Sequence, residues 1–173
     1  MDEDKYKEIL VSNSEESYGS SYKKDVLELY KSYLEMTDRI SSRRQSANAF
    51  FLTINSAIIG LVSYVNLGNN ASGLYWVIGI AGILICFTWY RLIRSYKDMN
   101  TGKFLVIHEI EKLLPLAIYD SEWEVLGRGN DPKKYLPFTN VELTVPLIFA
   151  GIHFFVIIFS IQWCNMTRYL SGQ

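Results

Sequence analysis

A chain of 173 residues with a net charge of −1 has room for one domain, and it lacks the basic balance that nucleic-acid binding requires. One fifth of its residues are charged, but polar and apolar residues are separated into long blocks. Several Trp and Tyr residues stand near the ends of the apolar blocks, as in the aromatic belts at membrane surfaces. The composition therefore predicts an integral membrane protein without a nucleic-acid partner.

The N-terminal residues are acidic and polar. They lack the basic stretch followed by an apolar stretch that marks a cleavable signal peptide. We expect residues 1–22 to form a disordered or loosely docked tail that stays in the cytosol. The two cysteines, Cys86 and Cys164, lie on different apolar blocks and show no zinc-binding spacing, so neither a metal nor a disulfide is indicated.

Helical spacing begins at Lys23. Side chains of a largely apolar seam recur at alternating steps of three and four residues, namely Val26, Tyr30, Tyr33, Thr37 and Ile40. No Gly or Pro interrupts the chain before Gly60, so a cytoplasmic helix over residues 23–48 can run straight into a first membrane span at 49–67. About twenty apolar residues suffice to cross roughly 30 Å of hydrocarbon.

A turn over residues 66–73, rich in Gly and Asn, separates the first span from a second at residues 74–93. Aromatic pairs flank this second span, Tyr75-Trp76 at one end and Trp89-Tyr90 at the other. Helical spacing then continues through Met99, Val106 and Leu113, which predicts a cytoplasmic extension over residues 94–114 that ends before Pro115.

Residues 115–142 are expected to form an irregular cytoplasmic segment with short helices. Asp120-Ser121 could cap a short helix around Trp123, and Asp131-Pro132 has the order expected where another helix begins. Thr139 and Glu142 fit a capping box that introduces a third span at residues 143–164. Residues 165–173 follow as an external tail. The predicted fold is an all-α membrane protein with three transmembrane helices, the first two extended as long amphipathic helices.

The basic residues predict the orientation in the membrane. Of the 17 Lys and Arg residues, all but Arg168 lie in the N-terminal segment or between the second and third spans. By the positive-inside rule these two regions are cytoplasmic, and the C-terminus lies outside.

A polar stripe climbs along the first predicted helix into the membrane, formed by Ser41, Gln45, Asn48 and Asn55. One reading is a water-lined path between helices. The other is hydrogen bonding between helices, which is the commoner use of such residues and contributes about 1 kcal/mol per bond.

Two histidines could carry chemistry. His153 lies in the third span, where an ionisable group suggests a proton-responsive site, although no Asp or Glu inside a span could partner it in a relay. His108 and Glu111 share a helical face, but one such pair supplies too few ligands for a metal. We therefore expect His153 to form a hydrogen bond between helices and His108 to lie on a solvated face.

Two groups of cations border the predicted membrane surface and are candidates for binding anionic lipid headgroups, at about 1 kcal/mol per cation. They are Arg39, Arg43, Arg44, Arg91, Arg94 and Lys97. Small residues at Gly60, Gly79 and Gly82 allow helices to approach closely, and ordinary packing within one chain is the favoured reading because none forms a strict GxxxG motif.

Two blocks of the sequence resemble the RipA family of octameric inner-membrane proteins of bacteria. They are Leu34–Asn55, which contains the Arg39, Arg43 and Arg44 cluster, and Trp89–Tyr96, which is followed by the helix that ends at Pro115 and by Tyr135–Phe138. The resemblance covers about residues 25–160. It implies a homo-oligomer, up to an octamer, in the cytoplasmic membrane and a link to adaptation or survival within a host. It implies no catalytic residues.

Two functions follow from these patterns. The first is a homo-oligomeric scaffold, in which the cytoplasmic helices contact neighbouring subunits. The alternative is a channel or pore-forming effector, with the Ser41 to Asn55 stripe lining its path. An enzyme is not expected, because no phosphate-binding glycine loop, nucleophile elbow, paired carboxylates or cofactor site can be named.

Overall fold

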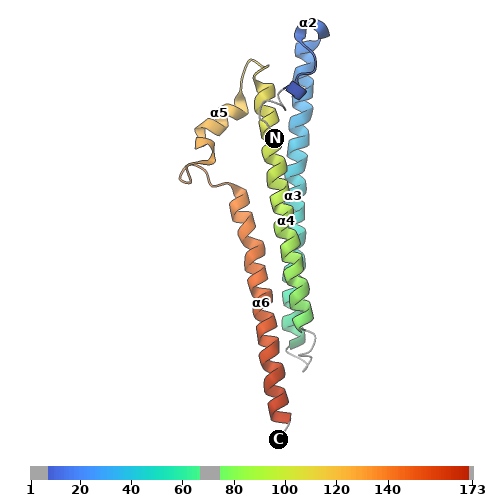
Figure 1. The fold of residues 1–173 in the computed structure, drawn as a ribbon, viewed down its shortest axis with the longest axis vertical. Coiled ribbons are helices and arrows are strands. Elements are labelled where there is room, and N and C mark those ends of the chain that lie inside the picture. Colours follow the sequence, from blue (N-terminus) through green and yellow to red (C-terminus); the bar gives the residue numbers. More distant parts are fainter. Residues whose placement is uncertain (1–7, 67–74, 172–173) are drawn as a thin grey trace. The chain divides into compact units, whose positions relative to one another are not determined.

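Every regular element in the part of the chain described by the computed structural model, residues 8–66 and 75–171, is helical. The elements are α2 (Glu15–Tyr18), α3 (Tyr22–Asn66), α4 (Tyr75–Glu111), α5 (Ile118–Val125), the 3-10 turn η1 (Gly127–Gly129) and α6 (Phe138–Ser171) (Figure 1). Of these described helices, α3, α4 and α6 are long and apolar enough to cross a membrane. The predicted all-α fold with three membrane helices, the first two long, is therefore confirmed.

The chain divides into two compact units, and α3 and α4 contribute residues to both. The polar unit combines the residues up to Ser42 with Tyr96–Pro137, and the membrane unit combines Arg43–Ser95 with the residues from Phe138 onward. The turn expected at residues 66–73 lies outside the described residues from Leu67 on.

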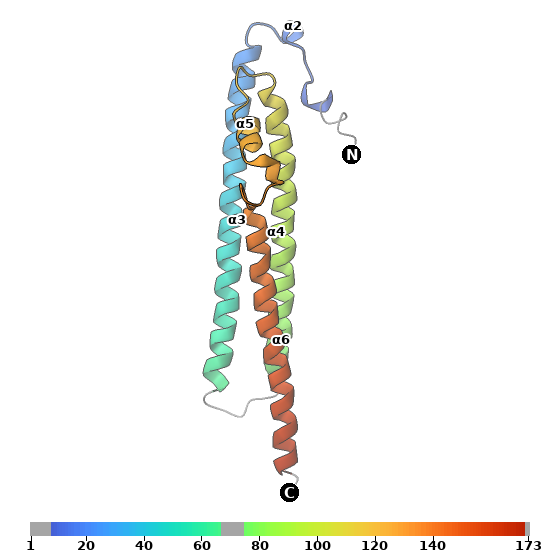
Figure 2. The same cartoon turned by 90° about the vertical axis from the view of Figure 1, so that its left-hand side faces the viewer.

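The seam of α3 packs against α4 within the polar unit. Tyr30 and Thr37 of the seam are buried, and Ile107 of α4 is fully buried. The Tyr30 hydroxyl donates a hydrogen bond of 2.9 Å to Glu111 at the end of α4, and the Lys103 ammonium lies 4.2 Å from the centre of the Tyr33 ring. Part of the apolar surface predicted on the two helices is therefore covered by the chain itself, while α5 lies beside the α3–α4 pair (Figure 2).

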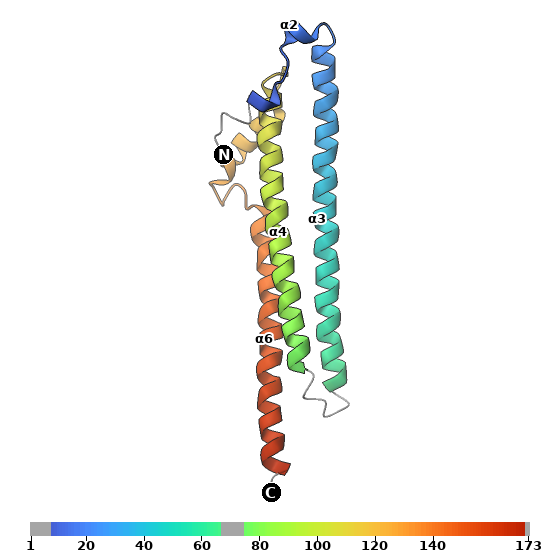
Figure 3. The same cartoon turned by 45° about the vertical axis from the view of Figure 1, so that its right-hand side comes forward.

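The membrane unit holds α3, α4 and α6 side by side around Trp89. The Trp89 ring is stacked on Phe51 of α3 at 5.8 Å between centroids and lies 6.2 Å from Phe149 of α6. Figure 3 shows the ribbons of the three long helices α3, α4 and α6 running along one another. Aromatic rings of this size bury large apolar areas, so this stack anchors all three helices to one another.

Two glycines of α4 allow the close approach of α6. A Cβ atom at Gly79 would collide with the side chain of Ile157, and one at Gly82 would collide with the His153 ring. The expected packing role of Gly79 and Gly82 within one chain is thereby confirmed, whereas a Cβ at Gly60 would meet open space.

Three expected helix starts differ from the structure, two in the segment between α4 and α6 and one at the start of α6. The helix around Trp123 begins at Ile118, so Asp120 and Ser121 lie inside its first turn, and the Ser121 hydroxyl donates to the Ala117 carbonyl at 2.6 Å instead of capping. No helix begins at Pro132. There, a turn forms in which the Asp131 carboxylate accepts from the Lys133 amide at 3.0 Å. Short polar side chains form such local turns as readily as caps, which is why the cap reading was wrong here.

The third long helix begins earlier and ends later than the expected span of residues 143–164. It starts at Phe138, so Thr139 lies in its first turn and the capping box at Thr139 is wrong. Pro137 precedes the helix, and Pro146 lies within it without ending it. The helix continues through the expected C-terminal tail to Ser171. The expected N-terminal tail contains the short helix α2, whose first turn is capped by Ser14.

Candidate functional site

A polar cluster inside the membrane unit joins all three long helices at Asn55. This side chain is fully buried, and its carbonyl oxygen accepts from the Cys86 thiol of α4 at 3.2 Å and meets His153 Nε2 of α6 at 3.0 Å. Its amide nitrogen donates to the Phe51 carbonyl of its own helix at 2.8 Å. Because the Asn55 oxygen can only accept, His153 carries its proton on Nε2 in this arrangement. The expected hydrogen bond of His153 to a neighbouring helix is confirmed.

A second polar chain lies at the end of the membrane unit where α6 begins. The Trp89 indole donates to the Asn48 oxygen at 2.9 Å, and the Asn48 amide donates to Glu142 at 3.0 Å. The Arg44 guanidinium lies 3.7 Å from the same carboxylate oxygen of Glu142. Arg44 and Glu142 are both largely buried, so this pair is an internal link between α3 and α6.

The four residues of the predicted stripe do not share one environment. Asn48 and Asn55 form the internal bonds described above, whereas Gln45 is exposed. The half-buried Ser41 belongs to the polar unit, where its hydroxyl donates to the Thr37 carbonyl of the same helix at 3.3 Å. The spacing therefore correctly places two residues against neighbouring helices, but it does not produce one continuous polar face.

The six cations proposed for lipid headgroups are also placed differently from one another. Arg44 pairs with Glu142, and Arg39 pairs with Glu35 one turn earlier at 2.7 Å. The remaining four are exposed, namely Arg43, Arg91, Arg94 and Lys97. Contact of these exposed residues with anionic headgroups stays a prediction.

Glu111 organises the polar unit, and the sequence patterns did not identify this role. Its carboxylate is 1% exposed and accepts from the Tyr30 hydroxyl and from the Tyr119 amide, both at 2.9 Å, and from the Asp120 amide at 3.0 Å. It therefore caps the first turn of α5 from eight residues upstream and ties that turn to α3. Burial, followed by the hydrogen bond to Glu111, raises the pKa of Tyr30 well above its ordinary value.

His108 lies beside Asp120 instead of on an open face. Its Nδ1 lies 3.8 Å from Asp120, and Asp120 lies 3.5 Å from Arg128. Among the described residues, no group of three or more His, Cys, Asp and Glu side chains is placed to hold a metal ion.

The polar unit leaves many large apolar side chains exposed. On α3 and α4 they include Leu29, Met36 and Met99, and in the segment after α4 and around α5 they include Leu113, Leu116, Ile118 and Val125. Charged residues of the same helices form exposed pairs between them, such as Lys31 with Glu28. These apolar side chains therefore lie in a water-facing region, where patches of this kind mark contacts with other proteins.

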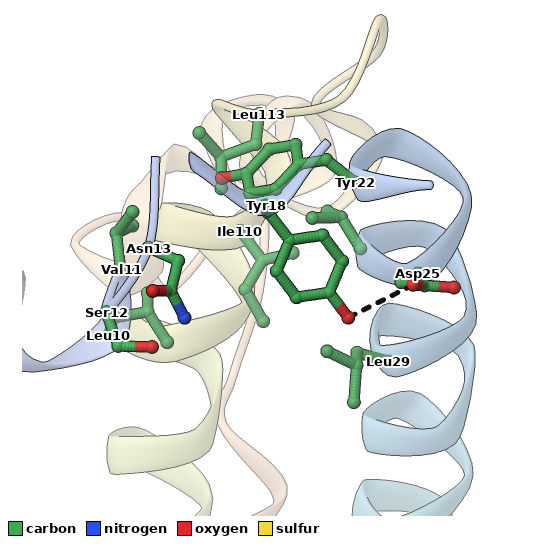
Figure 4. A pocket seen from close by; sticks show the side chains of 11 residues that line it. Leu10, Val11, Ser12, Asn13, Tyr18, Tyr22, Asp25, Leu29, Ile110 and Leu113 are labelled. Atoms are coloured by element: carbon green, nitrogen blue, oxygen red, sulfur yellow. Dashed lines mark hydrogen bonds between the residues drawn. The ribbon is translucent and has the colours of Figure 1, made fainter. Parts of the chain in front are cut away.

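A cavity of about 180 Å³ in the polar unit lies between the N-terminal segment and the ends of α3 and α4 (Figure 4). Leu10 and Val11 line it from the N-terminal segment, together with Leu29 of α3 and Leu113 just after the end of α4. The Tyr18 hydroxyl donates to Asp25 beside it at 3.1 Å, and this bond raises the pKa of Tyr18. The lining is mostly apolar and contains no group of ligands or catalytic side chains.

These features define an α-helical membrane protein with three spans and a water-facing polar unit. The chain belongs to the octameric membrane protein family (8xMP), whose pattern matches residues 27–162. It is therefore a homo-oligomeric membrane protein of that family, as the resemblance implied, although the match does not extend to the narrower RipA name. No curated protein and no solved structure matches the chain.

Proposed function

We propose that this protein is a structural or interaction scaffold of the bacterial cytoplasmic membrane, assembled through its polar unit. The observation that carries the proposal is the set of apolar side chains that the polar unit exposes to water, from Leu29 and Met36 on α3 to Val125 on α5. Membership of an octameric family supports the same conclusion. The N-terminus and the polar unit face the cytosol in this proposal, and the C-terminus lies outside.

Burial energetics favour contacts between copies of the chain. Leu29 is 69% exposed and Val125 is 74% exposed, and each such side chain gains about 1.5–3 kcal/mol when it is fully buried. Lipid cannot cover these positions if exposed ion pairs such as Glu35–Arg39 on the same helix face water. Neighbouring subunits are the partners that an octameric family supplies. The resemblance to proteins linked with survival in a host extends the proposed scaffold to that setting.

The alternative of a channel lined by the polar stripe has less support. Asn55, the stripe residue deepest in the first span, is 0% exposed and is occupied by Cys86 and His153 of the same chain. A path at the axis of an oligomer would need this side chain to face outward. We also propose that the protein is not an enzyme, because the polar clusters described above form structural hydrogen bonds and ion pairs.

Native mass spectrometry of the protein in lipid nanodiscs tests the scaffold directly. We expect an octamer that persists after dilution, and a monomer in both nanodiscs and mild detergent would contradict the proposal. Ion flux from liposomes tests the alternative, with Asn55→Leu as the matched variant. We expect no flux above that of empty liposomes, whereas flux that Asn55→Leu abolishes while the variant still assembles like wild type would establish a channel.

A further inference from the structure

Two apolar strips, one on α3 and one on α4, lie along one side of the helix pair in the polar unit, and we call the surface that they form the α3–α4 groove. Met99 and Val106 lie seven residues apart on α4, and Leu29 and Met36 lie seven residues apart on α3, so each pair forms one strip along its helix. Leu29 lines the cavity together with Ile110, which lies four residues after Val106 on the same face of α4, so both strips are on the same side of the pair (Figure 4).

The N-terminal segment covers only one end of this groove. Leu10 and Val11 line the cavity with Leu29 and Leu113, so the groove already receives apolar side chains at that end. Further along, Met36 is 50% exposed and Met99 is 41% exposed. This open stretch of the groove lacks a partner within the described chain.

A second apolar surface lies on α5 and the residues just before it. Leu116, Ile118 and Val125 are each more than 60% exposed. Ile118 and Val125 are seven residues apart and therefore project from the same side of α5. We call these three residues the α5 ridge.

The groove and the α5 ridge belong to opposite sides of the helix pair. The first turn of α5 packs on Phe104 and Glu111 of α4, through the Tyr119 ring at 6.0 Å and the Tyr119 amide at 2.9 Å. Phe104 and Glu111 lie on one flank of α4, and the strip of Met99 and Val106 lies on the other flank by helical spacing. One polar unit therefore presents two different apolar surfaces, on opposite flanks of α4.

The symmetry of an octamer in a membrane requires two different contact surfaces on each copy. Copies of a membrane protein with one topology share one orientation in the membrane, so no two-fold axis can lie in the membrane plane. An octamer of such copies is related by rotation about the membrane normal, and each contact in that ring joins two different surfaces of neighbouring copies. Rotation about this axis also keeps every copy at the same height. The first turn of α5 lies at the level of α4 between Phe104 and Glu111, which is also the level of Val106 in the groove.

We propose that the α5 ridge of each copy packs into the α3–α4 groove of the next copy, so that eight copies close a ring. This contact rests on the proposed scaffold and specifies which two surfaces of neighbouring copies meet. Each subunit contributes a ridge on one side and a groove on the other, and both surfaces are used in every copy.

Disulfide cross-linking of the full-length protein in membranes tests this arrangement. The double variants Met36→Cys with Val125→Cys and Met99→Cys with Val125→Cys place one thiol in the groove and one on the ridge. We expect mild oxidation to give a ladder of linked products up to the octamer for at least one of the two pairs. Wild type, which retains Cys86 and Cys164, sets the background.

The single variants distinguish a ring from a two-fold contact. Val125→Cys alone should stay at the wild-type background, and a mixture of Met36→Cys chains with Val125→Cys chains should stop at linked dimers. Strong dimer formation by Val125→Cys alone would overturn the proposal, because it requires two ridges to meet.

A charge variant provides a readout that does not depend on thiol geometry. Val125→Asp should lose most of the octamer in native mass spectra, whereas Leu105→Asp, at an exposed apolar residue outside both surfaces, should retain it. An intact octamer with Val125→Asp and no ladder from either double variant would overturn the ridge-and-groove contact while leaving the scaffold standing. A monomeric wild type would instead contradict the scaffold itself.

Discussion

Asn55 shows how much a single amide can organise within a membrane. Its oxygen accepts from Cys86 and His153, and its nitrogen donates to the Phe51 carbonyl, so one side chain connects three helices. A donor left without a partner in this setting loses its hydrogen bond with no water to replace it. The sequence spacing predicted that Asn55 faces protein, but its partners lie 31 and 98 residues away, beyond what helical periodicity can indicate.

Asn55→Leu should therefore lower the free energy of unfolding by about 1–3 kcal/mol, since it leaves the His153 Nε2 and Cys86 donors unpaired. Reversible unfolding in bicelles measures this change. Thr53→Val is the matched control, because Thr53 is exposed and bonds only to the Ala49 carbonyl of its own helix. Equal losses for the two variants would argue against a special role of the Asn55 cluster.

Tyr30 should make the unfolding free energy of the protein fall at alkaline pH. Burial and the hydrogen bond to Glu111 raise its pKa in the folded protein above the ordinary value of 10.0 that applies when the chain is unfolded. The unfolded state therefore releases the phenol proton first, so this contribution to stability is complete below about pH 10 and is lost as the pH rises above it. Tyr30→Phe should show a shallower fall in unfolding free energy between about pH 9 and about pH 11 than wild type. Parallel slopes for the two proteins would exclude Tyr30 as the source.

At the scale of elements, α5 depends on a cap that is distant in sequence. Glu111 accepts the amides of Tyr119 and Asp120, whereas Ser121, part of the expected cap, bonds back to Ala117. Glu111→Ala should destabilise the first turn of α5 by about 1.5–3 kcal/mol, since hydrogen bonds to a charged group are lost. Hydrogen exchange of the peptide over residues 115–126 should speed up in Glu111→Ala and stay near wild type in Ser121→Ala. Faster exchange in Ser121→Ala than in Glu111→Ala would instead show that Ser121 caps the helix.

The contact between α4 and α6 depends on the missing side chain at Gly82. A methyl group there would press on the His153 imidazole, so Gly82→Ala should cost about 1–3 kcal/mol of unfolding free energy. Gly60→Ala, which meets open space, should instead be neutral or stabilise by up to about 1 kcal/mol through helix propensity. Combining Gly82→Ala with His153→Ala should cost less than the sum of the two single changes, because the two residues are in contact.

Long elements were predictable because one signal repeats along them. The apolar blocks and the stretch without Gly or Pro after Lys23 correctly predicted three long helices, two of which continue beyond the apolar block. Helix ends were predicted less well, because each depends on one or two hydrogen bonds. Thr139 has the right residue type for a cap, yet α6 begins at Phe138, directly after Pro137. The seam of Tyr30 and Thr37 was predicted as apolar, but whether α4 or another subunit covers it depends on tertiary contacts that periodicity does not encode.

At the scale of the whole molecule, basic residues lie at the end of the second span, where the chain passes from the membrane unit into the polar unit. Exposed Arg91 and Arg94 border the second span, and Lys97 follows directly after them. Positive charge beside a span resists transfer across the membrane, while acidic residues contribute little to orientation. The scaffold requires every polar unit to face the same compartment, because the α5 ridge of one copy must meet the groove of another.

Orientation should therefore fail when the basic residues at the second span are removed. Arg91→Gln, Arg94→Gln and Lys97→Gln combined should yield a mixed population in which a fraction of the polar units faces outward. A Ser121→Cys label site reports this, because a membrane-impermeant maleimide should reach it in intact cells only in the inverted fraction. Neutralising three acidic residues instead, with Glu122→Gln, Glu124→Gln and Asp131→Asn, should leave the site protected. The inverted fraction should also reduce the yield of octamer, since an inverted copy cannot offer its ridge to a neighbour, and a full octamer yield from a mixed population would contradict assembly through the polar unit.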